Sequence, residues 1–146
     1  MAISFGGEFF VARRPEEVFD FLTNPNRFAP LLPDFRGLAT EDDKSFTVKV
    51  LVGISHIRGP AEVKLHLAEA DRPRHALYRG QGSLAGGNVD LSAGFKLAAT
   101  TEGTRVVWKG EAQVFGRLTS VAGGLLQPLA RKNVEKLIEG LKTALA

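Results

Sequence analysis

Four segments between residues 46 and 114 alternate small or apolar residues with polar ones, and this alternation limits the fold more than any other feature of the chain. A period of two is typical of half-buried β-strands. Turn signals occur at residues 41–43, 53–55, 71–73, 86–88 and 102–103. Their spacing suits hairpins and predicts an antiparallel sheet with one solvated face. The inward positions are Phe46, Val48, Val50 and Val52; Ile57, Gly59, Ala61, Val63, Leu65 and Leu67; Val89, Leu91, Ala93, Phe95 and Leu97; and Val106, Trp108, Gly110, Ala112 and Val114.

The first thirty residues predict one strand and two short helices. Residues 3–11 alternate like the later strands. Pro15, followed by Glu16 and Glu17, is typical of a helix start, because the acidic side chains face the positive end of the helix dipole. The dipeptide Asn24-Pro25 ends that helix and caps a second one. The anchors of the second helix are Phe28, Leu31 and Leu32.

The segment from about residue 118 to 145 predicts one long helix. At 1.5 Å per residue it would extend roughly 42 Å, so it needs a long, curved sheet to cover it. Pro128 lies inside it and predicts a bend. Asn133 interrupts the apolar stripe. The stripe consists of Leu118, Ala122, Leu125, Leu129, Leu137, Leu141 and Leu145.

Composition and charge exclude several classes of function. A chain of 146 residues can bury a core, and the absence of cysteine excludes disulfides, thiolate metal sites and a cysteine nucleophile. The N-terminus has no basic leader before an apolar run, and no apolar stretch approaches the roughly 20 residues of a membrane span. We therefore expect a cytoplasmic protein.

The whole net charge of +3 lies in residues 117–146, because the earlier residues carry equal numbers of acidic and basic side chains. This basic helix either touches an anionic membrane surface or partner, which would place the protein at the membrane periphery, or is an ordinary solvated helix face. Three surplus charges are too few for a nucleic-acid footprint, so no nucleic-acid partner is expected.

Several short motifs together resemble the helix-grip START (SRPBCC) superfamily, and the chain is most similar to the G-subunit of carbon monoxide dehydrogenase and its relatives. Coenzyme Q-binding and polyketide cyclase proteins are more distant relatives. The motifs are Phe9-x-Val11, Pro15-Glu16-Glu17-Val18-Phe19, Leu22-x-Asn24-Pro25, Pro33, Tyr78-x-Gly80-x-Gly82, Gly103-Thr104 and Val114-x-Gly116-Arg117-Leu118.

The resemblance implies a single START-like ligand-binding domain over residues 1–146, of the α+β class. Its curved antiparallel sheet of about six or seven strands wraps around the long C-terminal helix, and two short helices follow the first strand. An apolar cavity between sheet and helix would bind a lipid, sterol, quinone or polyketide-like molecule.

The residues give a separate argument for that cavity. Gly59, Ala61, Ala93, Gly110 and Ala112 all point inward by parity, so they either leave a void or let the helix pack closely. Asn133 either hydrogen-bonds a ligand or lies at the edge of a stripe that the Pro128 bend shifts toward Leu126, Ala130 and Val134. Tyr78 presents its hydroxyl either inward or to water. The expected ligand-binding residues are Phe9, Val50, Val63, Tyr78, Phe95, Trp108, Gly110, Leu125, Leu129 and Asn133, and the candidate lid residues, or plain packing anchors, are Phe28, Leu31 and Leu32.

Catalytic and metal-binding motifs are missing from the sequence. It contains no P-loop, no Gly-x-Ser-x-Gly elbow and no His-Glu-x-x-His pair, and His56, His66 and His75 are not spaced to share a metal. We therefore expect no catalytic residue, metal or cofactor, and a non-enzymatic binder or carrier of a hydrophobic small molecule. The alternatives are a cyclase-like enzyme, which needs a buried acid or base in the cavity, and an accessory or maturation protein that contacts a metalloenzyme of the carbon monoxide dehydrogenase type.

Overall fold

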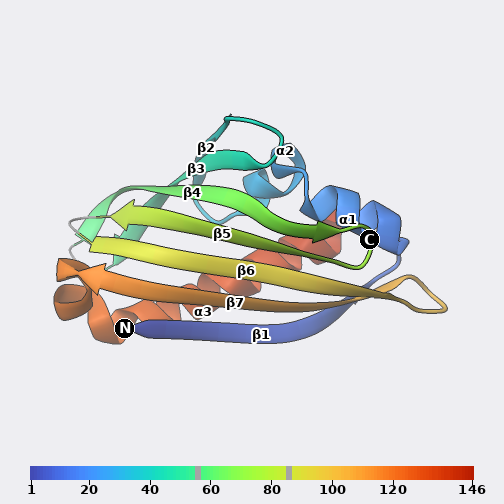
Figure 1. Ribbon diagram of the computed structural model, residues 1–146. Helices are drawn as coiled ribbons and strands as arrows, with labels where there is room; N and C mark the ends of the chain where they lie inside the picture. Colours follow the sequence, from blue (N-terminus) through green and yellow to red (C-terminus); the bar gives the residue numbers. More distant parts are fainter. Residues whose placement is uncertain (55–56, 85–86) are drawn as a thin grey trace.

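The computed structural model contains one antiparallel sheet with a long helix lying on one of its faces (Figure 1). It describes the backbone of residues 1–54, 57–84 and 87–146, and the side chains of all of these except residues 54, 57, 84, 117, 118 and 120–123. His56, part of the expected turns at 53–55 and 86–88, and the stripe positions Leu118 and Ala122 therefore lie outside the described residues or side chains.

The seven strands of the sheet follow the order β1-β7-β6-β5-β4-β3-β2, and every neighbouring pair is antiparallel. This arrangement, with two short helices after the first strand and a long C-terminal helix, confirms the predicted fold class. The elements are β1 (Ala2–Val11), α1 (Pro15–Leu22), α2 (Pro25–Phe28), the 3₁₀ turn η1 (Ala29–Leu31), β2 (Phe35–Thr40), β3 (Ser45–Ile54), β4 (Ile57–Asp71), β5 (His75–Leu84), β6 (Gly87–Ala99), β7 (Thr104–Gly116) and α3 (Arg117–Ala144).

The short helices begin and end where the sequence predicts. Pro15 occupies the first turn of α1, and the Thr23 hydroxyl closes that helix by donating to the Phe19 carbonyl oxygen at 2.8 Å. The Asn24 side chain accepts a hydrogen bond from the Asn26 backbone at 3.1 Å and so caps α2. α3 continues through Pro128 without interruption of the helix.

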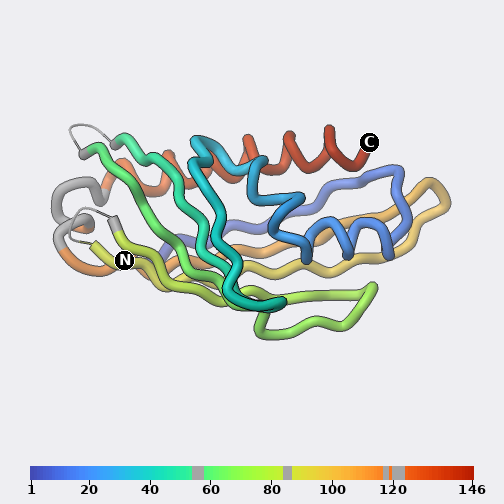
Figure 2. The backbone as a smooth tube through the Cα atoms, turned by 90° about the horizontal axis from the view of Figure 1, so that it is seen from above, coloured from blue at the N-terminus to red at the C-terminus, as the bar shows by residue number. Residues whose placement is uncertain are grey.

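Two strands, β2 and β5, lie outside the alternating segments, and β2 is also irregular. The pairing of β2 with β3 shifts register between Phe35 and Gly37, so the side chains of β2 do not keep a period of two. Figure 2 shows α3 on one face of the sheet, which we call the concave face.

The buried core consists of three separate clusters on this face. The α1 cluster joins α1 and the end of α3 to the sheet, the β1 cluster lies under the middle of α3, and the α2 cluster lies under α2 and η1. The α1 cluster contains Phe9, Val11, Val18, Phe19, Phe21, Ala76, Leu97, Val106, Leu141 and Leu145; the β1 cluster contains Ile3, Val114 and Leu126; the α2 cluster contains Ala29, Phe46, Val48 and Tyr78.

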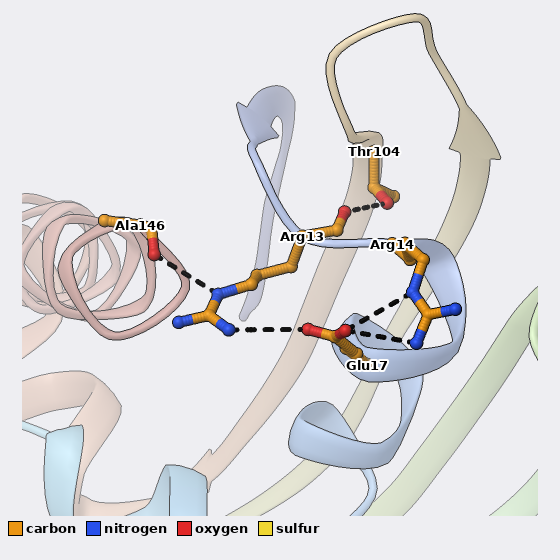
Figure 3. Close-up of polar contacts among 5 residues, drawn as sticks. All are labelled: Arg13, Arg14, Glu17, Thr104 and Ala146. Atoms are coloured by element: carbon orange, nitrogen blue, oxygen red, sulfur yellow. Dashed lines mark hydrogen bonds and ion pairs between the residues drawn. The ribbon is translucent and has the colours of Figure 1, made fainter.

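A polar corner ties the C-terminus to the turn between β1 and α1 (Figure 3). Arg13 donates from Nε to the carbonyl oxygen of Ala146 at 3.2 Å and pairs with Glu17 at 3.5 Å. Arg14 contacts the same carboxylate through two nitrogens at 3.3 Å. Because Arg13 follows β1 and Ala146 follows α3, these contacts hold the last turn of α3 against the start of α1.

Candidate functional site

The middle of the concave face is not covered by any of the three clusters. Residues directly opposite each other in an antiparallel ladder point to the same face, and Phe5, Gly110, Ala93 and Tyr78 form such a row across four strands. Tyr78 is buried, yet Ala93, two strands from Phe5 on the same face, is exposed. The side chains around Ala93 therefore leave an opening above it.

The two inward glycines border open space as well. A methyl group on Gly110 would approach no atom more closely than the Ser92 carbonyl oxygen at 4.0 Å. A methyl group on Gly59 would have no neighbour within 4 Å. Ala61, by contrast, is buried, and Ala112 packs against the β1 cluster. The five small inward residues thus divide between open space, at Gly59, Ala93 and Gly110, and close packing at the two other alanines.

Aromatic side chains form the wall on the α2 side. The rings of Phe28, Phe46 and Tyr78 lie 5.8–5.9 Å apart, centroid to centroid. The Tyr78 hydroxyl donates to the Leu22 carbonyl oxygen at 2.9 Å, and burial raises the pKa of this phenol. The hydroxyl therefore points inward, as one of the two alternatives from the sequence had it, and there it anchors the end of α1.

The long helix presents a single polar side chain between two clusters. Leu129 packs against the β1 cluster and Leu137 against the α1 cluster. Asn133 lies one helical turn from each, on the same helix face, and is half-buried. Its amide is therefore located on the stretch of α3 between the two clusters.

The expected stripe of α3 is wrong at one position. Leu125 is 48% exposed, whereas its neighbour Leu126 is 7% exposed and belongs to the β1 cluster. Ala130 also packs there, so the buried stripe of the first half of α3 follows Leu126 and Ala130. The sequence left this shift open as an alternative, because Leu125 and Leu126 are equally apolar.

The structure places most of the other expected ligand-binding residues in or against the core clusters. Phe9 lies inside the α1 cluster, and Phe95 and Trp108 pack against it. Val50 packs against the α2 cluster, and Val63 is half-buried on β4. The opening also has an apolar neighbour outside the expected set, Leu91, which is half-buried and belongs to no cluster.

The three candidate lid residues all pack against the protein. Phe28 contacts both the α1 and the α2 cluster, and Leu32 packs against the α2 cluster. Leu31 lies close to α3, since a methyl group on Gly140 would be 3.6 Å from its Cβ atom. In this structure they act as anchors, and a role as a lid remains a prediction.

Charged groups lie outside this opening. On the surface, the Asp20 carboxylate accepts two hydrogen bonds from Arg72 at 2.8 and 2.9 Å, and these hold its pKa below the ordinary value. The described residues contain no group of three His, Asp or Glu side chains that could hold a metal ion. None of the helices in the described part of the chain is long and apolar enough to cross a membrane.

Solved structures similar to this chain share its fold at low sequence identity. A conserved protein from Geobacillus kaustophilus is 16% identical with a TM-score of 0.83, over 99% of this chain and 95% of that chain. The Zhui aromatase/cyclase from Streptomyces sp. R1128 is 16% identical with a TM-score of 0.67, over 99% and 92%. The di-domain aromatase/cyclase StfQ of the steffimycin biosynthetic pathway is 11% identical with a TM-score of 0.68, over 99% and 51%.

No curated protein matches the chain. The family model of CoxG, the G-subunit of carbon monoxide dehydrogenase, matches residues 7–146, and this family together with the cyclase-like fold fits a ligand-binding domain of the helix-grip type. Because the match covers nearly the whole chain, the protein belongs to the CoxG family of carbon monoxide dehydrogenase and has the helix-grip fold.

Proposed function

We propose that this protein binds and carries a hydrophobic small molecule in the opening on the concave face, beneath α3. The observation that carries the proposal is the row of Gly110 and Ala93, where inward-facing positions meet open space and not packed side chains. Neither Gly110 nor Ala93 belongs to any of the three clusters, so a ligand could occupy this space without displacing a packed core.

The chemistry of the wall supports an apolar ligand. Leu91, Val63 and Ala93 are inward-facing, partly exposed and members of none of the three clusters. Apolar surface that remains accessible to water favours burial by about 25 cal/mol per Å². A bound lipid, quinone or sterol-like molecule would supply that burial, as in most small-molecule sites of this kind.

Asn133 supports a ligand with one polar group. Its side chain is half-buried between apolar neighbours on α3, and an amide can donate to a carbonyl or hydroxyl oxygen of a ligand. A pure hydrocarbon would leave this amide without a partner, at a cost of about 1–3 kcal/mol if it became buried. We therefore favour a quinone, sterol or fatty acid over an alkane-like molecule.

The test replaces one glycine of β7 by a larger residue, so that the new side chain occupies the proposed binding space. Gly110→Leu adds a side chain where the backbone leaves room, so we expect it to fold and to lose binding. Lys109→Leu is the matched control, because it adds the same side chain on the opposite face at the neighbouring position. Binding is read from the fluorescence of Trp108, the only tryptophan, on titration with a short-chain ubiquinone and, separately, with oleate.

The same proteins are examined by native mass spectrometry and solvent extraction after purification from their own cells. Loss of the co-purified lipophile from the Gly110→Leu protein alone supports the proposal. Failure of the unmodified protein to hold any lipophile, or to bind quinone and fatty acid at about micromolar concentration, overturns it. A product formed from the probe would instead favour a cyclase-like enzyme.

We further propose a protein partner, a metalloenzyme of the carbon monoxide dehydrogenase type, on the strength of the family to which the chain belongs. In this role the protein delivers or removes its ligand during maturation or turnover of the enzyme. Affinity purification from its own cells should recover such an enzyme. Recovery of the lipophile without any enzyme would retain the carrier and reject this partner.

A further inference from the structure

The outer edge of β1 carries backbone groups without a strand to pair with. Met1 and Val114 exchange two hydrogen bonds, from the Met1 amino group to the Val114 carbonyl at 3.1 Å and from the Val114 amide to the Met1 carbonyl at 2.8 Å. Inward and outward backbone groups alternate along an antiparallel strand. The odd-numbered residues of β1 therefore pair with β7, and the even-numbered ones point their N–H and C=O groups to the free edge.

The two edges of the sheet are protected very differently. β2 has six residues, a register shift and a nearby proline, Pro33, all of which discourage a further strand. β1 has ten residues, an unbroken register and neither lysine nor proline. Its only charge, Glu8, is paired with Arg105 on β7. β1 is thus a long edge without the usual devices that prevent pairing.

A groove follows this edge between β1 and α3. One hollow of about 440 Å³ is lined by residues 5–8, Trp108 and α3. A second hollow of about 580 Å³, near Met1 and Pro128, shares Arg131 and Glu135 with the first. The residues of α3 that line the groove lie on the side of the helix opposite to Asn133, whereas Phe5 and Trp108 of the groove also face the concave side of the sheet beside Gly110.

The charges of the groove are arranged in order along the edge. α3 runs in the same direction as β1, because Leu126 packs near Ile3 and Leu141 belongs to the cluster of Phe9. The guanidinium of Arg131 lies 5.2 Å above the ring of Phe5. Glu135 and Glu139 follow along α3 and line the groove beyond it. One half of the groove is therefore basic and the other half is acidic.

We propose that the occupant of this edge is a second copy of the chain, paired antiparallel through β1 about a two-fold axis at Gly6. This register pairs Gly6 with its own copy and Ser4 with the partner's Glu8, and it uses all five outward residues. An axis at Glu8 would place two carboxylates directly opposite each other, which is unfavourable. The glycine at the axis adds no side chain between the copies.

The same register makes the groove charges complementary. Phe5 lies opposite the partner's Gly7, so Arg131 above Phe5 faces the acidic half of the partner's groove, near the partner's Glu135. The symmetry repeats this contact on the other side of the axis. The dimer has one continuous sheet across both copies and leaves the concave opening of each copy free, so it does not depend on the proposed ligand.

The first experiment measures mass and amide exchange together. Light scattering between about 1 and 500 µM should show a monomer–dimer equilibrium. In hydrogen exchange followed by NMR, the amides of Ser4, Gly6 and Glu8 should slow as the dimer forms, while those of Phe5 and Gly7 are slow throughout. A monomer at every concentration, with fast exchange at the even-numbered residues, overturns the proposal.

Two pairs of variants locate the interface. Ser4→Pro removes one outward amide and should raise the dissociation constant by about tenfold or more, whereas Ser4→Ala keeps the amide and should change it little. Arg131→Glu should weaken the dimer, and the matched charge change Lys136→Glu, on the far side of α3, should not. The double variant Arg131→Glu with Glu135→Arg should restore it.

If neither Ser4→Pro nor Arg131→Glu raises the dissociation constant of the dimer, the dimer uses another surface and the proposal is overturned. So does a monomer whose even-numbered amides are protected by a co-purified peptide, because the edge then serves a different chain. Circular dichroism of each variant confirms folding, so that loss of the dimer is not confused with unfolding.

Discussion

The hydroxyl oxygen of Thr104 lies 2.7 Å from the carbonyl oxygen of Arg13, and Thr104 is completely buried. Through this hydrogen bond the first residue of β7 holds the corner between β1 and α1 (Figure 3). Arg13 in turn contacts the end of the chain at Ala146, so one buried hydroxyl connects three parts of the fold that are distant in sequence.

We predict that Thr104→Val lowers the free energy of unfolding by about 1–3 kcal/mol, because the Arg13 carbonyl loses its donor in a buried place. Thr104→Ser keeps the hydroxyl and should cost clearly less than the valine variant. Urea unfolding monitored by circular dichroism measures both. A loss for valine no larger than the loss for serine would contradict a stabilising role of this hydrogen bond.

The strands and helices could be predicted because their signals are local. The alternation at Val106 to Val114 and the caps at Pro15 and Asn24 depend on neighbours in the sequence, and all of these elements are present. β2 lacks such a signal because its register shift at Phe35 breaks the period of two. The hydrogen bond from Thr104 to the Arg13 carbonyl joins residues far apart in the chain, so no local sequence pattern predicts it.

For the candidate site, the sequence predicts which residues face inward but not how closely the helix packs on them. Parity correctly placed Gly110 and Ala93 on the inward face, but parity does not give the distance between sheet and helix. That distance decides whether a glycine is packed, and it depends on how the three clusters hold α3. The choice between Leu125 and Leu126 depends in the same way on a rotation of the helix of about 100°, which two equally apolar residues do not specify.

Gly80 should tolerate no side chain, in contrast to Gly59. A methyl group on Gly80 would overlap the Lys64 carbonyl oxygen and approach Leu65 Cδ2 to 2.6 Å, so β4 and β5 would have to separate. We predict that Gly80→Ala lowers the free energy of unfolding by about 1–3 kcal/mol. Gly59→Ala, which meets nothing within 4 Å, should be close to neutral. Thermal unfolding of both variants compares them, and equal stability would contradict the tight packing at Gly80.

Arg72 should control the titration of Asp20. Its hydrogen bonds hold the pKa of the Asp20 carboxyl below the ordinary value, so the folded state favours the ionised form. This contribution to stability is present above the ordinary pKa of aspartate and is lost as the pH falls through the lowered one. Arg72→Gln should raise the pKa of Asp20 toward 3.8, measured by NMR titration of its carboxyl carbon. An unchanged pKa would show that the pair does not form in solution.

The Arg72→Gln variant should unfold at nearly the same urea concentration as the unmodified protein at neutral pH. Both side chains of the pair are about half exposed, and water screens such a pair. The difference between the two proteins should shrink further in acid, where Asp20 is protonated in both. A large loss of stability at neutral pH would mean that Arg72 has a packing role beyond this ion pair.

Tyr78 should make the stability of the protein depend on alkaline pH. Burial raises the pKa of its phenol, and the hydroxyl donates to the Leu22 carbonyl oxygen, so the folded state requires the neutral form. The unfolded state releases the proton near pH 10, the ordinary value, and the folded state does so only at higher pH. The contribution is therefore complete below about pH 10 and is lost as the pH rises above it.

Tyr78→Phe should lower the free energy of unfolding by about 1 kcal/mol at neutral pH, because the Leu22 carbonyl loses its donor. Above about pH 10 the stabilities of the two proteins should converge, since only the unmodified protein has a phenol to ionise on unfolding. Tyr78 is the only tyrosine, so the ultraviolet absorbance of tyrosinate reports its ionisation alone. A constant difference across this pH range, or tyrosinate in the folded protein near pH 10, would contradict a buried and hydrogen-bonded Tyr78.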